Sequence, residues 1–198
     1  MSGVLRVLSA AVLAGCLASV VSAQDASKSQ SAAPAAPSIQ AAAVPTANPT
    51  DVSSVDAIMA ATYDVISGPP TKKRDWDRFR SLFVPGARLI PADRGKDGTF
   101  KVDVITPDEY AKMADPYFLK NGFAEREIFR KSERYGNIMQ IFSTYESRHD
   151  ASDAKPFARG INSFQLLYDG KRWWVVTIYW QEEDADNPLP KEFLPAGK

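Results

Sequence analysis

The sequence predicts an α+β domain: a curved antiparallel sheet of four long strands plus short strands, with three helices from the N-terminal half packed on one face. Two observations predict this class. Apolar residues recur at helical spacing only before residue 122, whereas four long β-rich runs occupy residues 123–181. Asp169 and Gly170, which separate the last two runs, are typical of a two-residue type I′ hairpin turn.

Three helices are predicted between residues 53 and 121. Ser53 and Ser54 are suitable caps for the first, whose apolar face extends over residues 55–66. A short second helix is expected over residues 76–83. A third begins at Thr106, a capping residue followed by a proline and two acids, and Pro116 is expected to bend it or to begin a new turn. Short strands are expected over residues 87–90 and 100–105.

The long strands are predicted over residues 123–135, 137–149, 159–168 and 172–181. Along the last of them, Trp174 and Trp180 are expected on one face and Trp173 and Tyr179 on the other. Both faces are apolar, which is typical of a central strand that is covered on both sides. The second cover is expected to be loops, the C-terminal tail or a dimer partner.

Residues 1–23 are typical of an export signal, because Arg6 precedes a short apolar run that ends in a small-x-small site at Ala23. The run is shorter than the roughly 18–20 residues that span a bilayer. Leu13-Ala14-Gly15-Cys16 also resembles the bacterial lipobox, in which the cysteine is lipidated. We favour cleavage after Ala23 and an exported, periplasmic or secreted protein; the alternative is a protein anchored to the envelope through Cys16.

Residues 24–50 are predicted to form a disordered linker. They are rich in Ala, Pro and Ser and contain no aromatic residue, so they cannot bury enough apolar surface to offset the entropy lost on ordering. All ten Phe, seven Tyr and four Trp follow Asp51. One domain with an aromatic core and an extended C-terminal tail is therefore expected over residues 51–198.

Composition excludes several classes of function. The 24 Lys and Arg balance the 24 Asp and Glu, so the basic excess of a general nucleic-acid binder is absent. One Cys and one His are too few for a multi-Cys zinc site or a His-rich metal site, and no phosphate- or dinucleotide-binding motif occurs. We expect no metal, no cofactor and no nucleic-acid partner, and contact with a membrane only if Cys16 is lipidated.

Two packing patterns flank the predicted third helix: Phe79-x-x-Leu82-Phe83-x-x-x-Ala87-x-Leu89 before it and Gly170-x-x-Trp173-Trp174-x-Val176-x-x-x-Trp180 after it. With the order of elements, they resemble the nuclear transport factor 2-like superfamily, which includes polyketide cyclases, steroid isomerases and many uncharacterised bacterial exported proteins. The resemblance covers about residues 53–184. It implies a cone-shaped domain with a pocket between sheet and helices, lined by Trp180.

The resemblance does not carry steroid-isomerase activity over to this chain. That reaction needs a proton-shuttling base and a protonated carboxyl donor. By the spacing of the family, the base position falls at Pro91, with Asp93 two residues beyond, and the donor position falls at Arg159. Neither residue matches its role.

His149 and Asp93 are the candidate catalytic residues. His149 ends a long strand beside Asp150, where it could act as a general base at the mouth of a pocket. The alternative is a solvent-exposed histidine in a polar hairpin.

The candidate ligand-binding residues are Trp180, Arg159, Asn162, Tyr145 and Tyr63. Arg159 could bind a carboxylate or phosphate through its fork of donors, or it could form an ion pair with Glu146 or Glu182. Asn162 shares the face of Phe164 and needs a polar partner there. The aromatic candidates either line the pocket or belong to the core. The alternating charges over residues 125–134 are interpreted as a solvated strand or cross-strand ion pairs.

These observations support three hypotheses of function. The first is an exported binding or accessory protein, a homodimer through its sheet face, which holds a small apolar or amphipathic ligand. The second is an enzyme of the polyketide-cyclase or isomerase type that uses His149, Asp93 or Arg159. The third is an envelope protein-interaction module, which a cavity smaller than about 300 Å³ would favour.

Overall fold

A computed structural model of the protein describes residues 44–95 and 97–197. The predicted signal at residues 1–23, Cys16 and most of the predicted linker lie outside the described residues. The first short helix, α1 (Pro49–Val52), packs on the domain core through the buried side chain of Val52. None of the helices in the described ranges is long and apolar enough to cross a membrane.

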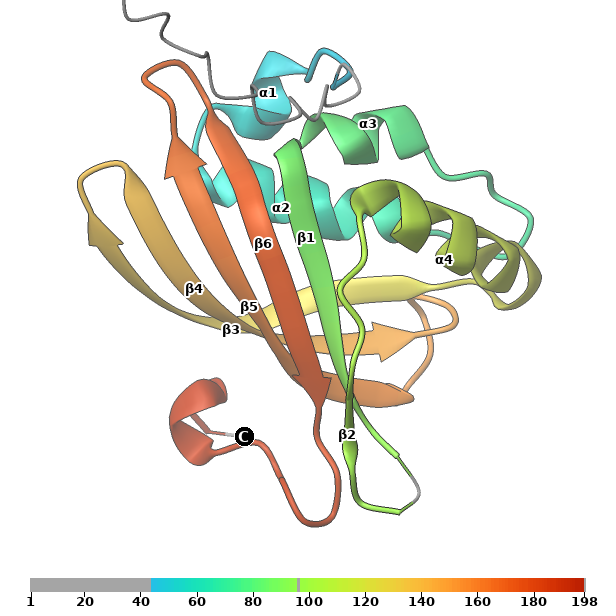
Figure 1. The fold of residues 1–198 in the computed structure, drawn as a ribbon. Helices are drawn as coiled ribbons and strands as arrows, with labels where there is room; N and C mark the ends of the chain where they lie inside the picture. Colours follow the sequence, from blue (N-terminus) through green and yellow to red (C-terminus); the bar gives the residue numbers. More distant parts are fainter. Residues whose placement is uncertain (1–43, 96, 198) are drawn as a thin grey trace, which may run out of the picture. The chain divides into compact units, whose positions relative to one another are not determined.

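A six-stranded sheet in the order β2-β1-β6-β5-β4-β3 forms the framework (Figure 1). Its strands are β1 (Phe83–Arg94), β2 (Phe100–Val102), β3 (Ala124–Tyr135), β4 (Ile138–Arg148), β5 (Ala158–Tyr168) and β6 (Trp173–Glu182). Neighbouring strands are antiparallel except β1 and β6, which are parallel. The predicted α+β class and its four long strands are confirmed. β1 is longer than expected because it begins at Phe83, before Pro85 and Gly86.

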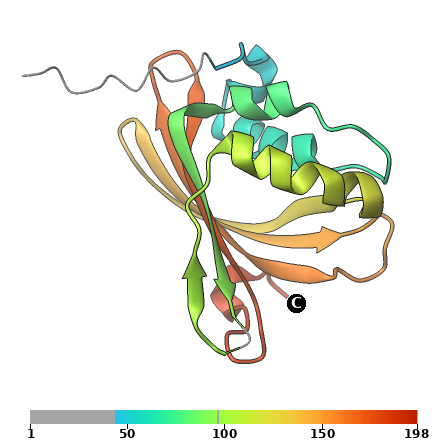
Figure 2. The same cartoon turned by 45° about the vertical axis from the view of Figure 1, so that its right-hand side comes forward.

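The helices α2 (Val55–Ile66), α3 (Trp76–Ser81) and α4 (Pro107–Asn121) cover one face of the curved sheet (Figure 2). Ser54 caps α2, since its Oγ accepts a hydrogen bond from the backbone N–H of Ala57 at 3.0 Å. Thr106 and Glu109 form a capping box at the start of α4. α4 continues through Pro116 without interruption.

A β-bulge in β6 decides which of its side chains face the helices. Val176 has no partner in β5, because the residues on either side of it pair with consecutive residues of that strand. The bulge shifts the alternation by one residue, so Trp173 and Trp180 both lie on the helix-covered side. The expectation that Trp174 shares the face of Trp180 is wrong: its indole Nε1 donates to a carboxylate oxygen of Asp169 at 2.7 Å, at the hairpin.

The hairpin between β5 and β6 is confirmed, but its loop differs from the predicted two-residue turn. Tyr168 pairs with Trp173, so the loop contains four residues. The carboxylate of Asp169 accepts hydrogen bonds from the backbone N–H groups of Lys171 and Arg172, both at 2.8 Å. These bonds close the longer loop.

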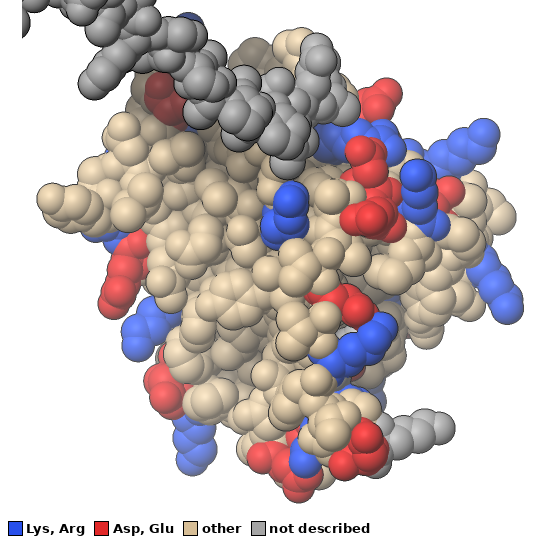
Figure 3. Space-filling view, viewed as in Figure 1, with Lys and Arg blue, Asp and Glu red and all other residues tan. Residues whose placement is uncertain are grey.

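Charged side chains of both signs lie close together on the face shown in Figure 3. Arg80, for example, pairs with Asp77 at 3.0 Å and with Asp108 at 2.5 Å. Positive and negative groups are therefore interspersed on this face.

Arg74 holds the connection between α2 and α3. Its buried guanidinium donates hydrogen bonds to the backbone carbonyls of Ile66 at 2.8 Å, Gly68 at 2.6 Å and Lys72 at 2.5 Å. The carbonyl groups at the end of a helix have no hydrogen-bond donor within the helix, so Arg74 supplies the donor that α2 lacks.

We predict that Arg74→Met lowers the free energy of unfolding by about 2–4 kcal/mol, since the carbonyls lose their donors in a largely buried place. Urea denaturation measures the change. The matched control is Lys73→Met, which removes the charge of the exposed neighbour. Equal stability of the two variants would show that the Arg74 bonds contribute nothing.

Candidate functional site

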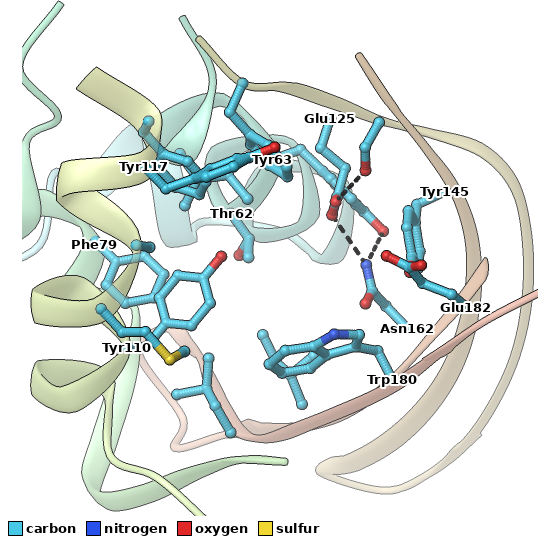
Figure 4. Close-up of a pocket in the computed structure, with 18 of the residues that line it drawn as sticks. Thr62, Tyr63, Phe79, Tyr110, Tyr117, Glu125, Tyr145, Asn162, Trp180 and Glu182 are labelled. Carbon is cyan, nitrogen blue, oxygen red and sulfur yellow. Dashed lines mark hydrogen bonds between the residues drawn. The ribbon is translucent and has the colours of Figure 1, made fainter. Parts of the chain in front are cut away.

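A cavity of about 300 Å³ lies between the concave face of the sheet and the helices α2, α3 and α4 (Figure 4). Its volume is at the lower end of the roughly 300–1,000 Å³ typical of small-molecule sites. The lining is mostly apolar and aromatic. It consists of Thr62, Tyr63, Ile66, Phe79, Leu89, Tyr110, Met113, Ala114, Tyr117, Phe118, Phe123, Glu125, Tyr145, Ser147, Phe157, Asn162, Phe164, Ile178, Trp180 and Glu182.

Three aromatic rings form one wall of the cavity. Tyr110 of α4 stacks on Phe79 of α3 at 5.5 Å between ring centroids, and meets Trp180 of β6 edge to face at 6.2 Å. Such arrangements suit the quadrupoles of the rings and hold them rigidly. The wall therefore offers a ligand a preformed apolar surface.

Glu125, near the start of β3, is the central polar group of the cavity. Ser67, at the end of α2, fixes its backbone, since the Glu125 N–H donates to Ser67 Oγ at 3.0 Å. Its carboxyl accepts hydrogen bonds from Asn162 Nδ2 at 3.2 Å and from Ser147 Oγ at 2.7 Å. Lys and Arg are absent from the described residues that line the cavity. The carboxyl thus has hydrogen-bond donors but no cationic partner among these lining residues.

Burial in this cavity raises the pKa of Glu125 to about 7. The hydrogen bonds from Ser147 and Asn162 oppose the shift, because they favour the charged form, and the nearby Glu182 adds to it. Glu125 therefore changes its protonation state near neutral pH. A protonated Glu125 can donate a hydrogen bond to a ligand.

A chain of hydrogen bonds connects Glu125 to a second carboxylate outside the cavity. Asn162 Nδ2 also donates to the hydroxyl of Tyr63 at 3.1 Å, Tyr63 bonds with Ser143 Oγ at 2.6 Å, and Ser143 donates to a carboxylate oxygen of Glu127. Because the single proton of Ser143 is directed at Glu127, the Tyr63 hydroxyl must donate to Ser143. The proton of Tyr63 is therefore unavailable to a ligand.

Two other donors do face the cavity. In the described part of the chain, neither the hydroxyl of Tyr110 nor the indole Nε1 of Trp180 has a hydrogen-bond partner. Figure 4 shows both side chains directed into the cavity. In this view Tyr110 lies on the side opposite Tyr145, and Trp180 lies below Asn162. Together with Glu125 they offer a ligand three polar contacts within one apolar space.

The structure brings together four of the five predicted ligand-binding residues, since Trp180, Asn162, Tyr145 and Tyr63 all line the cavity. Tyr145 lies here because Gly160 is opposite it across β4 and β5. A Cβ at Gly160 would lie 2.6 Å from the Tyr145 hydroxyl and 2.2 Å from the carbonyl oxygen of Gln181. Only glycine permits this close approach.

The other candidates lie elsewhere. Arg159 does not line the cavity and forms an ion pair with Glu183 at 2.5 Å. The sequence suggested such a pair with Glu146 or Glu182, whereas the partner found is Glu183. His149 is exposed, and its ring stacks on Phe157 at the cavity margin with 4.5 Å between centroids. The backbone of Asp93 pairs with Lys101 in β2. Its side chain lies outside what the structure describes.

Glu125 is the functional candidate that the sequence interpretation missed. The alternating charges over residues 125–134 predicted a solvated strand or ion pairs, which is wrong for this residue. The sequence did contain one signal for Glu125. Alternate residues of a strand face the same side, so Glu125 shares a strand face with Phe123, which also lines the cavity. Across the described residues, the structure holds no group of three or more His, Cys, Asp or Glu side chains able to bind a metal ion.

No family model and no curated protein matches the chain. A solved structure from Nostoc punctiforme, a protein of unknown function with a cystatin-like fold, matches with a TM-score of 0.50 and 8% identity over 66% of this chain and 90% of the other. The domain has a cystatin-like fold.

Two further solved structures are similar to the chain at lower scores. Both are nuclear transport factor 2-like proteins of unknown function. The protein from Shewanella baltica has a TM-score of 0.43 and 14% identity over 65% of this chain and 90% of its own. The protein from Silicibacter pomeroyi has a TM-score of 0.45 and 11% identity over 66% and 94%. Similarity of fold does not by itself assign an activity.

We predict that Glu125→Gln changes how stability depends on pH. The folded-state pKa of about 7 lies above the value near 4.3 expected for an unfolded chain, so the folded protein binds this proton more tightly. The wild type therefore loses stability relative to Glu125→Gln as pH rises through the interval between these two values. The difference grows from near zero at about pH 4 to roughly 3–4 kcal/mol at about pH 8.

Urea denaturation across this pH range measures the difference. Glu133→Gln, an exposed glutamate of the same strand, is the matched control and should follow the wild type. If Glu125→Gln also follows the wild type at every pH, the carboxyl of Glu125 is hydrated and titrates as it does in water.

Proposed function

We propose that the protein binds a small, mostly apolar, uncharged molecule that carries a hydrogen-bond-accepting oxygen, such as a ketone. One observation carries this proposal: a carboxyl with a pKa of about 7 stands in an aromatic cavity beside two donors without partners in the described chain. Protonated Glu125, the Tyr110 hydroxyl and the Trp180 indole N–H are all able to donate to such an oxygen.

The charge of the lining supports an uncharged ligand. Glu125 and Glu182 are its acidic residues, and no basic residue is among the described residues that form it. An anionic ligand would meet like charge without a compensating cation, in a place where the low dielectric strengthens repulsion. The carboxylate or phosphate ligand that Arg159 suggested therefore does not fit this cavity.

An enzyme that transfers protons is the second candidate. A carboxyl whose pKa lies near the working pH is suited to general acid–base catalysis. The donors of Tyr110 and Trp180 would stabilise charge that develops on a carbonyl oxygen while Glu125 removes a proton from the neighbouring carbon. The same three residues therefore serve both candidate functions, binding and catalysis. The two functions are distinguished by whether the bound molecule is chemically converted.

A matched pair of naphthalene compounds tests the proposal. We expect 2-acetylnaphthalene, an uncharged ketone, to bind the full chain in calorimetry, and 2-naphthoate, an anion of similar size, to bind at least about tenfold more weakly. Tyr110→Phe should weaken the ketone several-fold because one hydrogen bond is lost. Tyr179→Phe, which removes an exposed hydroxyl on the other sheet face, is the matched control.

Equal binding of the ketone and the anion, or no saturable binding of either, would overturn the proposal. Exchange of the acetyl protons with deuterated water, followed by proton NMR, separates the two candidates. Exchange catalysed by the wild type and abolished in Glu125→Gln would establish an enzyme. Binding without exchange would leave a binding protein.

We also propose that the domain acts after export, either free or anchored to the envelope. Residues 1–23 support this, with cleavage after Ala23 as the favoured route. Mass spectrometry of the protein from its own cells should find Gln24 at the N-terminus, and Cys16→Ser should leave this unchanged. A lipidated Cys16 would establish the anchored form. An intact N-terminus in the cytosol would contradict export.

A further inference from the structure

A second cavity, of about 440 Å³, lies on the face of the sheet that the helices do not cover. The sheet separates it from the first cavity, because the side chains of β5 alternate between the two. Asn162 and Phe164 line the first cavity, whereas Ile161 and Ser163 line the second. Among the described residues, Trp180 is the one that lines both cavities; the rest of each lining belongs to one cavity alone.

The C-terminal segment, residues 183–197, forms the roof of this second cavity and is attached at both ends. Figures 1 and 2 show it on the side of the sheet away from α2 and α4. At its start, Glu183 pairs with Arg159 at 2.5 Å, and Asp186 accepts a hydrogen bond from Arg94 at 2.7 Å. These pairs fix the point at which the segment leaves β6.

The other end of the roof is held by Phe193. Its ring packs against Phe142 at 5.6 Å between centroids, and its carbonyl oxygen accepts a hydrogen bond from Thr144 Oγ1 at 2.7 Å. The roof is thus attached to the sheet on both sides of the cavity. The second cavity is therefore a feature of the folded chain.

The middle of the roof, Pro188-Leu189-Pro190, presents an apolar surface to the cavity. The two prolines carry no N–H group. The N–H of Leu189 is already occupied, since it donates to the carboxylate of Glu183 at 3.3 Å. The roof therefore offers a ligand hydrocarbon and no unsatisfied backbone donor at these three residues.

The floor of the cavity holds one polar group without a partner. Ser163 is 2% exposed, and among the described residues its Oγ is the buried side-chain atom that lacks a hydrogen bond. Its neighbours across the strands are Phe142 and Tyr179, which also line the cavity. A buried hydroxyl without a partner destabilises a protein, so its presence requires an explanation.

We propose that this second cavity binds an uncharged lipid-like molecule, with an aliphatic chain beneath the roof and one hydroxyl or ester oxygen bonded to Ser163 Oγ. The lining decides the class of ligand. Glu183, the one charged residue among the described residues that line it, is already paired with Arg159, so an ionic head group would find no free charge there. Apolar side chains dominate the rest of the surface.

Octanol, with octanoate as its charged counterpart, serves as the probe for the full chain. We expect octanol to bind saturably in NMR titrations and to shift the methyl signals of Ile161 and Leu189, which line this cavity. Shifts at the methyl signals of Ile66 and Leu89 would report octanol in the first cavity, whose proposed ligands are also uncharged, so the two pairs of signals are followed separately. Octanoate should bind more weakly because its charge finds no partner.

Ser163→Ala should have two effects of opposite sign. It removes an unpaired buried hydroxyl, so the urea midpoint of the ligand-free protein should rise. It also removes the hydrogen bond to octanol, so the affinity should fall about fivefold. Ser132→Ala, an exposed serine of β3, is the matched control and should change neither quantity. A purely structural role of Ser163 would not weaken binding.

Three results would overturn the proposal: octanol shifts confined to Ile66 and Leu89, octanol affinity unchanged in Ser163→Ala, or occupation of this face by a second copy of the chain. The last corresponds to the homodimer expected from the sequence. Light scattering tests it, with Tyr179→Asp as the disrupting variant. A dimer that this variant dissociates, together with no octanol binding to the wild type, would identify the second copy as the occupant.

Discussion

Curvature of the sheet is the constraint on which the rest of the molecule depends, and it requires interruptions in the hydrogen-bonded ladders. The ladders are interrupted at Ile128 in β3, at Val176 in β6 and between Phe83 and Arg88 in β1. Each bulge bends its strand and moves the following side chain to the other face. The bend wraps the sheet around α2 and α4, and the shift places Trp180 toward the helices. A regular ladder through Val176 would direct Trp180 away from the cavity.

Within the space that the curvature creates, Glu125 is the group whose placement is energetically unfavourable. A carboxylate without a cationic partner loses its hydration when it enters an apolar cavity. Ser147 and Asn162 satisfy its oxygens by hydrogen bonds but do not restore the lost solvation. Proteins retain such unfavourable groups mainly where they are used, and the same desolvation that destabilises Glu125 brings its pKa close to neutrality. The destabilisation and the chemical usefulness have one physical cause.

Much of this fold follows from local patterns in the sequence. Helical spacing and capping residues located α2 and α4, and β-rich runs located β3 to β6 within a few residues. The faces of the strands were harder to predict, because a bulge leaves no local signature: Trp174 and Trp180 differ by an even number of residues and still lie on opposite sides. Glu125 was missed for a related reason. Its charged neighbours suggested solvent, and only the long-range packing of α2 on β3 encloses it.

The hydrogen bonds that lead from Asn162 through Tyr63 and Ser143 to Glu127 have a fixed order of donors and acceptors. This order has a consequence for specificity. Glu127 lies outside the cavity, yet as the terminal acceptor it orients Ser143, which in turn draws the proton of Tyr63 away from the ligand space. A residue at position 127 that donated to Ser143 would reverse the order and release the Tyr63 proton toward the cavity. The polarity of the cavity is thus set partly by a residue that no ligand touches, so substitutions behind the wall can alter ligand choice while the wall itself stays the same.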